Sequence, residues 1–152
     1  MMKKILIAVA CIFICVILMS FGRESENIIE EQEIDVDLTQ LSSTMVYAQV
    51  FDMLVSPDTY QGKTIKMRGN FTQYEAPEGS PVLNPGQRYF ACVITDALAC
   101  CSQGIDFELR GNLSFPEDYP KLGSEITVVG TFQQIDKNGY SYTCITNASL
   151  EE

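Results

Sequence analysis

Four cysteines and one aspartate are the residues of this chain best suited to chemistry. Three of the cysteines and the aspartate lie close together in the stretch ACVITDALACCSQG, and they are Cys92, Asp96, Cys100 and Cys101. Three thiolates, completed by Asp96 or by Cys144 near the carboxyl end, would supply the tetrahedral sulfur and oxygen ligands that suit Zn²⁺. Three sulfurs alone would suit Cu(I). The pattern therefore predicts a soft-metal site in which Zn or Cu is the cofactor.

The default interpretation of the same four cysteines is a disulfide framework, which is common in exported domains of this size. Cys100 and Cys101 fall on the turn after a predicted strand, and a bond between neighbouring cysteines would be a strained ring. One disulfide with two free thiols is therefore a further arrangement. Cys11 and Cys15 lie in an apolar segment and are expected to serve there as small apolar residues.

Enzymatic chemistry finds little support. The chain contains no histidine, so Ser-His and Cys-His nucleophile pairs, an imidazole base and histidine-bound metals are all excluded. It has neither the C-x-x-C motif of thiol-disulfide oxidoreductases nor a glycine-rich phosphate loop. We expect a protein that binds and is not an enzyme.

The amino terminus predicts export. Lys3 and Lys4 precede an uncharged run over residues 5–21, so residues 1–22 read as a signal peptide or a single membrane anchor. A lipoprotein signal at Cys11 is a third possibility, because a small residue precedes that cysteine. The lysines favour the cytoplasmic side, so the remaining chain is expected to be attached to the cell membrane facing outside, or to be secreted.

Composition divides the rest of the chain in two. Residues 23–43 are rich in Glu, Gln and Asp and lack a sustained hydrophobic period, which predicts an acidic linker. Residues 44–152 are expected to form one domain. The chain carries 20 acidic and 10 basic residues, a net charge of −10, and the basic residues are scattered. Nucleic-acid binding draws on clustered cations, so we expect no nucleic-acid partner.

One helix and five extended segments are predicted in this domain. Thr44 can cap a helix that runs to about Val55 and carries Tyr47, Val50, Phe51 and Leu54 on one face. Turn residues then separate extended segments at about 63–74, 87–95, 105–110, 124–135 and 139–147. The pattern is typical of a mainly β domain preceded by one amphipathic helix.

An internal repeat gives the most information about the fold. Gly62–Phe71 and Gly123–Phe132 share the motif G-x-x-I-x-x-x-G-x-F, and each follows a P-x-x-Y sequence. Alternation points the isoleucine, the residue two positions on and the phenylalanine to one side. The inner glycine permits a bulge, as a strand needs when it contributes to two parts of a closing barrel.

These motifs resemble those of an oligonucleotide/oligosaccharide-binding (OB) fold, of the kind found in tRNA-anti-like domains, over about residues 57–147. The resemblance implies a five-stranded Greek-key barrel. The central stretch is also similar to the carboxy-terminal OB-like domain of bacterial putative permease-subunit proteins, in which a Cys-Cys pair and an Asp-Ala lie near the same strand. Here Asp96-Ala97 precedes Cys100-Cys101.

Aromatic residues suggest a second binding surface. OB folds stack ligands on an exposed face of the barrel, and the candidates for such a face here are Tyr74, Tyr89, Tyr140 and Tyr142. Two functions follow for an exported OB-type domain. The first is binding of a soft metal at the cysteine-rich loop, linked to metal transport. The alternative is a disulfide-stapled module that recognises a protein or glycan partner without a metal.

Overall fold

The computed structural model describes residues 33–151 of the chain. The predicted signal peptide or anchor, residues 1–22, lies outside the described residues, as does the first part of the predicted linker. Within the described part, no helix combines the length and the hydropathy that crossing a bilayer requires.

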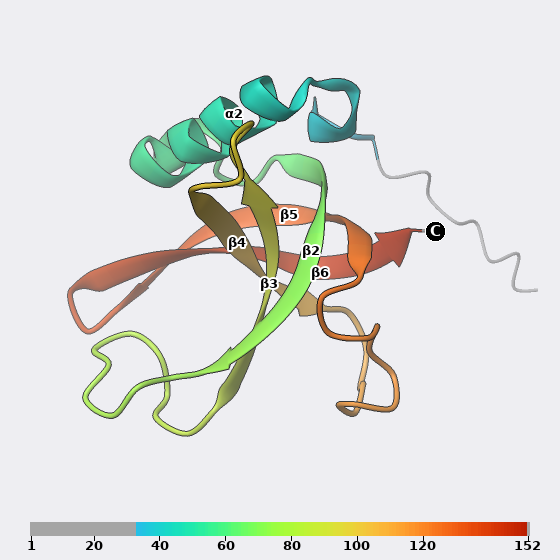
Figure 1. Cartoon of the computed structure of the whole chain (residues 1–152). Coiled ribbons are helices and arrows are strands. Elements are labelled where there is room, and N and C mark those ends of the chain that lie inside the picture. Colours follow the sequence, from blue (N-terminus) through green and yellow to red (C-terminus); the bar gives the residue numbers. More distant parts are fainter. Residues whose placement is uncertain (1–32, 152) are drawn as a thin grey trace, which may run out of the picture. The chain divides into compact units, whose positions relative to one another are not determined.

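The described residues form a mainly β domain with one α-helix (Figure 1). All five segments predicted to be extended are strands, and this prediction is confirmed. In chain order the elements are β1 (Val36–Asp37), η1 (Leu38–Gln40), α2 (Ser43–Val55), η2 (Pro57–Thr59), β2 (Thr64–Glu75), β3 (Arg88–Thr95), β4 (Ser102–Leu109), β5 (Glu125–Lys137) and β6 (Tyr140–Glu151), where η denotes a 3-10 helix.

The five long strands are linked by a circuit of pairings that returns to β2. The pairs β2–β3, β3–β4, β5–β6 and β2–β5 are antiparallel, whereas β4 and β6 are parallel. β2 joins two neighbours because it changes partner along its length, facing β5 over Thr64–Asn70 and β3 over Asn70–Glu75. Buried side chains from all five strands and from α2 form one hydrophobic cluster.

The internal repeat places two equivalent strands against each other. Met67 of β2 pairs with Val128 of β5, and these two residues occupy the same position of the repeated motif. The register is symmetric about this pair, from Thr64 opposite Thr131 to Asn70 opposite Glu125. A local two-fold axis therefore relates the two motifs, and sequence similarity between them reflects equivalent positions in the sheet.

The inner glycines of the repeat are required by close backbone contacts. A Cβ atom on Gly69 would lie 2.6 Å from the Val93 carbonyl oxygen, and one on Gly130 would lie 2.8 Å from the Thr146 carbonyl oxygen. The β5–β6 register shifts between the residues that flank Gly130, which confirms the predicted irregularity there. Any side chain at either glycine would force the neighbouring strand away.

The tyrosine of each P-x-x-Y sequence packs against the phenylalanine of the other motif. Tyr60, which precedes the β2 motif, packs edge-on against Phe132 of the β5 motif, with ring centroids 6.1 Å apart. Tyr119, which precedes the β5 motif, stacks on Phe71 of the β2 motif at 6.0 Å. Each lead-in turn thus closes over the opposite strand, and the symmetry extends beyond the two strands themselves.

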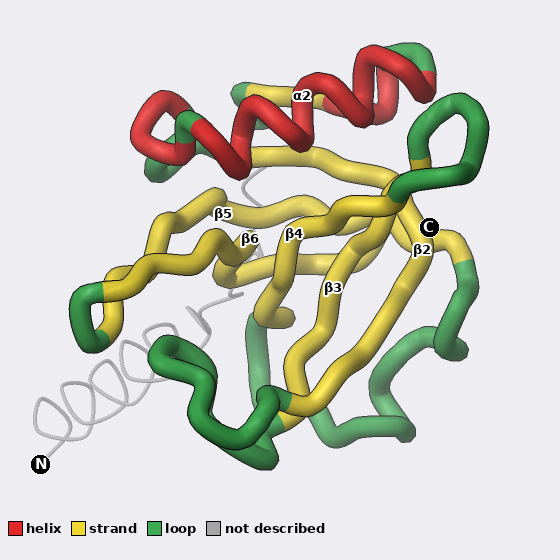
Figure 2. The backbone as a smooth tube through the Cα atoms, turned by 60° about the vertical axis from the view of Figure 1, so that its left-hand side comes forward, coloured by secondary structure: helices red, strands yellow, loops and turns green. Residues whose placement is uncertain are grey.

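Helix α2 lies across one end of the strands (Figure 2) and begins one residue before the predicted cap, Thr44. Its buried residues are Val50 and Met53. The prediction that Phe51 lies on the packed face is wrong, because that side chain is 56% exposed. The packed stripe passes through Val46, Val50 and Met53, at the spacing of one helical face, and Phe51 lies about 100° around the helix from Val50.

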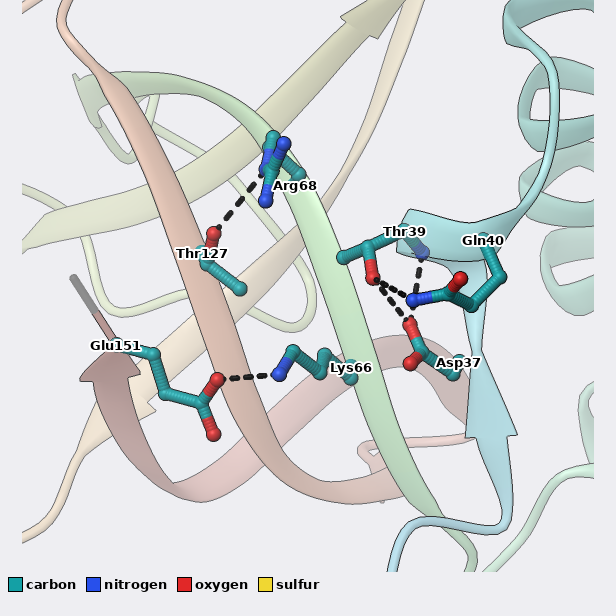
Figure 3. Close-up of polar contacts among 7 residues, drawn as sticks. All are labelled: Asp37, Thr39, Gln40, Lys66, Arg68, Thr127 and Glu151. Atoms are coloured by element: carbon teal, nitrogen blue, oxygen red, sulfur yellow. Dashed lines mark hydrogen bonds and ion pairs between the residues drawn. The ribbon is translucent and has the colours of Figure 1, made fainter.

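The predicted linker, residues 23–43, differs from the structure in its carboxyl part. Val36 and Asp37 form a short parallel strand with β2, and Leu38 is buried in the core. The Asp37 carboxylate caps the following turn by accepting hydrogen bonds from the Thr39 N–H at 2.9 Å and the Thr39 hydroxyl at 2.6 Å (Figure 3). A two-residue strand carries no periodic signal, which is why composition alone indicated a linker here.

Two polar contacts on the outer side of β2 complete this edge of the domain (Figure 3). Lys66 forms an ion pair with Glu151 at 2.5 Å, and Arg68 donates a hydrogen bond to the Thr127 hydroxyl at 3.4 Å. The ion pair joins β2 to the end of β6, two strands that do not pair directly.

Candidate functional site

The cysteine turn, residues 96–101, connects β3 to β4 and is organised by the Asp96 carboxylate. Asp96 Oδ1 accepts hydrogen bonds from the N–H of Cys100 at 2.9 Å and of Cys101 at 3.3 Å, while the Asp96 N–H donates to the Cys101 carbonyl at 2.9 Å. Ala99 has a φ of 53°, in the left-handed region that costs energy for residues other than glycine. The hydrogen bonds to Asp96 hold the turn in this shape.

The turn brings three metal-ligating atoms together. The Cys100 Sγ donates to Asp96 Oδ2 at 3.0 Å and lies 3.8 Å from the Cys101 Sγ. One carboxylate oxygen and the two sulfurs all lie within 4.8 Å of one another, and both thiols are exposed to solvent. Residues 96–101 thus present two thiols and a carboxylate on one exposed turn.

The thiol and the carboxylate of this turn affect each other's proton affinity. The hydrogen bond from Cys100 lowers the pKa of the Asp96 carboxyl below its ordinary value, because it stabilises the carboxylate. The same hydrogen bond, with a second one to Cys101, raises the pKa of the Cys100 thiol, because the thiolate would lose its role as a donor to Asp96. In the absence of a cation the turn therefore holds a carboxylate paired with a protonated thiol.

The turn lies beside the amino-terminal part of α2. The Gln103 side-chain amide donates to the Tyr47 carbonyl, which fixes the start of β4 to the helix. Burial raises the pKa of the Tyr47 phenol, and so do the charges of Cys101, Asp96 and Cys100, which places this phenol within electrostatic range of the turn. Figure 1 shows the β3–β4 connection reaching α2. Sequence periodicity placed Tyr47 on the helix but gave no indication of this neighbour.

Two of the five candidate metal ligands, Cys92 and Cys144, do not join the other three, and this part of the prediction needs correction. Cys92 lies in β3 opposite Ile105 and is fully buried in the core, near Gly69. Cys144 lies in β6 opposite Asp106 and is also buried, but on the other face of the sheet. Strand alternation thus separates Cys92 from Cys144 and keeps both out of reach of the turn.

The predicted disulfide framework is also absent from the described residues. All four of their cysteines are free thiols. Cys92 and Cys144 point to opposite faces, and the two turn sulfurs are 3.8 Å apart, well beyond the roughly 2.05 Å of a disulfide bond. Burial raises the pKa of both buried thiols to about 12, which disfavours the reactive thiolate form at neutral pH.

The four tyrosines predicted as a binding face are brought together only in part. Tyr74 and Tyr89 stack on each other with ring centroids 5.7 Å apart, and Tyr89 and Tyr142 line one groove. Tyr140 lies at the start of β6, is 59% exposed and does not line that groove. The groove is completed by residues that the sequence analysis did not assign to a binding site, and these include Asp106, Glu108 and Tyr119.

Comparisons with protein-family models, with curated proteins and with solved structures give no match for this chain.

Proposed function

We propose that this chain is an exported OB-type binding domain whose cysteine turn captures one thiophilic metal ion, Zn²⁺ or Cu(I), as a step in metal transport. The observation that carries the proposal is the convergence of the Asp96 carboxylate with the Cys100 and Cys101 thiols on an exposed turn. In this proposal the domain binds an ion and performs no catalysis.

The spacing of the donor atoms fits a tetrahedral ion. Two sulfurs that each lie about 2.3 Å from a zinc ion with tetrahedral angles are about 3.8 Å apart. The Cys100 and Cys101 sulfurs already have this separation, 3.8 Å, before any ion binds. The Asp96 oxygen hydrogen-bonded to Cys100 supplies the third ligand, and an ion would replace the thiol proton between them.

Three protein ligands leave one coordination position open. Structural zinc sites are usually closed by four protein ligands, whereas an open position accepts water or a ligand from another molecule. The turn is exposed, so a partner protein has access to that position. The open position and the exposed turn favour a site that takes up an ion and passes it on. They do not favour a site whose ion stabilises the fold.

The strand order supports the OB-type barrel within this proposal. The five long strands follow the order β2-β3-β4-β6-β5 and the last pairs again with the first, with β4 and β6 as the parallel pair. A sheet closed in this way has no free edge, as in a small Greek-key barrel. Export and outward attachment to the membrane rest on the apolar run over residues 5–21 and the two lysines before it.

Competition with a chromophoric chelator tests the metal site. The full-length reduced chain in mild detergent is titrated against a zinc-bound and, separately, a Cu(I)-bound chelator. We expect one ion per chain, and we expect Cys100→Ser/Cys101→Ser to abolish competition, since two of three ligands are lost. Affinity should fall as the pH is lowered, because protons compete for the thiols and Cys100 holds its proton more tightly than an ordinary thiol.

A matched control removes two other thiols. Cys11→Ser/Cys15→Ser lowers the number of cysteines equally but leaves the turn intact. Equal loss of metal in both double variants would show that the ion binds thiols without regard to position, and it would refute the proposed site. Retention of the ion by Cys100→Ser/Cys101→Ser would refute it as well.

A further inference from the structure

A groove separates the amino-terminal end of β3 from the carboxyl end of β4. These strands pair only from Ala91 opposite Asp106 to Thr95 opposite Ser102, so beyond Ala91 their backbones diverge. The resulting groove has a volume of about 350 Å³. This volume lies at the lower end of the range for small-molecule sites, about 300–1,000 Å³.

The walls of this groove combine phenol rings with carboxylates. Tyr89, Tyr119 and Tyr142 come from three separate parts of the chain, and Asp106 and Glu108 contribute the acids. Aromatic faces attract cations through their quadrupoles, and carboxylates attract them directly. The groove thus carries two independent features that recognise positive charge.

The carboxylates of the groove lack a cationic partner in the described part of the chain. Neither Asp106 nor Glu108 forms an ion pair there, although Asp106 accepts a hydrogen bond from the Tyr74 hydroxyl at 2.5 Å. Arg88 also lines the groove, but its guanidinium lies over the Phe115 ring at 4.6 Å and reaches Glu75 at 4.0 Å. The one basic side chain at the groove is therefore engaged elsewhere.

The carboxylates of the groove also affect the pKa values of the side chains around them. Burial raises the pKa of the Asp106 carboxyl by more than the Tyr74 hydrogen bond lowers it, and the neighbouring Glu108 charge raises it further. Burial is the main cause that raises the pKa of the Tyr142 phenol and of the Cys144 thiol, and the charges of Glu108 and Asp106 raise both further. A bound cation would offset the cost of holding these acids ionised.

We propose that this groove binds a small organic cation, an ammonium or guanidinium compound, through the Asp106 and Glu108 carboxylates and the aromatic rings of Tyr89, Tyr119 and Tyr142. The site is distinct from the cysteine turn in place and in chemistry, because it offers oxygen ligands and aromatic rings to a diffuse charge, whereas the turn offers thiols to a compact soft ion. Neither site depends on the other.

Titration with spermidine tests this proposal. The full-length chain is titrated at moderate salt with EDTA present, which removes divalent metal ions such as Zn²⁺. Binding is followed by calorimetry and by tyrosine fluorescence, since the chain has no tryptophan. We expect one spermidine per chain. Asp106→Asn/Glu108→Gln should weaken binding roughly tenfold or more, because both negative charges of the groove are lost.

The control is matched in net charge. Asp58→Asn/Asp136→Asn also removes two acids, both exposed and outside the groove, and should leave the affinity unchanged. Tyr142→Leu should weaken binding while Tyr142→Phe restores it, because only the ring is required. Equal weakening by the two acid double variants would mean general attraction to an acidic protein and would overturn the proposal. So would the absence of spermidine binding.

Discussion

Two Asp–Cys pairs in this domain have the same residue types and opposite properties. In the cysteine turn, Cys100 donates to Asp96 at 3.0 Å, and both side chains are accessible to solvent. On the outer face of the sheet, Cys144 lies opposite Asp106, but the Asp106 carboxylate is hydrogen-bonded by Tyr74 and the thiol is buried. In the first pair the thiol donates to the carboxylate, whereas in the second the carboxylate accepts from Tyr74.

The difference shows what decides whether a cysteine beside an acid can bind an ion. A thiol must lose its proton to become a ligand, and burial opposes that loss because the thiolate is poorly solvated. Cys144 meets this obstacle, with a pKa raised to about 12. Cys100 holds its proton through a hydrogen bond with an accessible carboxylate, which an incoming cation can displace. Accessibility therefore separates the two pairs more sharply than proximity does.

Thiol alkylation should reveal the largest contrast. Raising a thiol pKa from 9.0 to about 12 lowers the thiolate fraction about a thousandfold at neutral pH, so Cys92 and Cys144 should react with iodoacetamide at least that much more slowly than a thiol of ordinary pKa. Cys100 and Cys101 should be alkylated first. Peptide mass spectrometry at successive times measures the rate at each position, and unfolding in urea should abolish the protection. Equal native rates at all four positions would contradict the comparison.

A charge placed at each cysteine should give the next largest effect. Cys144→Asp introduces a second carboxylate beside Asp106 in a buried position, which we expect to lower the free energy of unfolding by about 3 kcal/mol or more. Cys100→Asp places the same group on the exposed turn and should leave the urea midpoint unchanged. If Cys144→Asp leaves the urea midpoint unchanged, solvent reaches this face of the sheet and the second Asp–Cys pair resembles the first.

Local patterns were sufficient to predict the framework of this domain. Alternation and turn residues located the five long strands, and the repeated G-x-x-I-x-x-x-G-x-F drew attention to Gly69 and Gly130 as positions of a bulge. That neither glycine has room for a side chain depends on carbonyl groups of neighbouring strands, which the structure alone shows. By contrast, β1 has only two residues, and the packed face of α2 depends on how the helix rests on the strands, which is why Phe51 was assigned wrongly.

Sequence spacing was sufficient to predict only part of the candidate sites. Asp96, Cys100 and Cys101 are close in sequence, so their convergence in one turn could be anticipated. The exclusion of Cys92 and Cys144 depends on the register of β3 and β6 and on which face each residue occupies. The groove at Asp106 depends on the divergence of β3 from β4, for which neither strand carries a sequence signal.

The pH dependence of stability should also distinguish Asp106 from Asp96, and these are the smallest effects that we predict. The folded-state pKa of Asp106 is raised above the ordinary 3.8, so its contribution to stability is complete below that value and is lost as the pH rises through the folded pKa. The folded-state pKa of Asp96 is lowered, so its contribution is present above 3.8 and is lost as the pH falls through the folded pKa.

Asparagine at each position should therefore change stability in opposite directions between about pH 3 and pH 7. Asp106→Asn should gain stability relative to the unsubstituted protein as the pH rises, whereas Asp96→Asn should lose it, and urea midpoints across this range measure both. The Asp96 effect should be the weaker, because that carboxylate is accessible to water and salt screens it, and it should shrink further at about 1 M salt. Parallel pH profiles for the two variants would mean that Asp106 is solvated like Asp96, and the distinction between the two Asp–Cys pairs would then no longer hold.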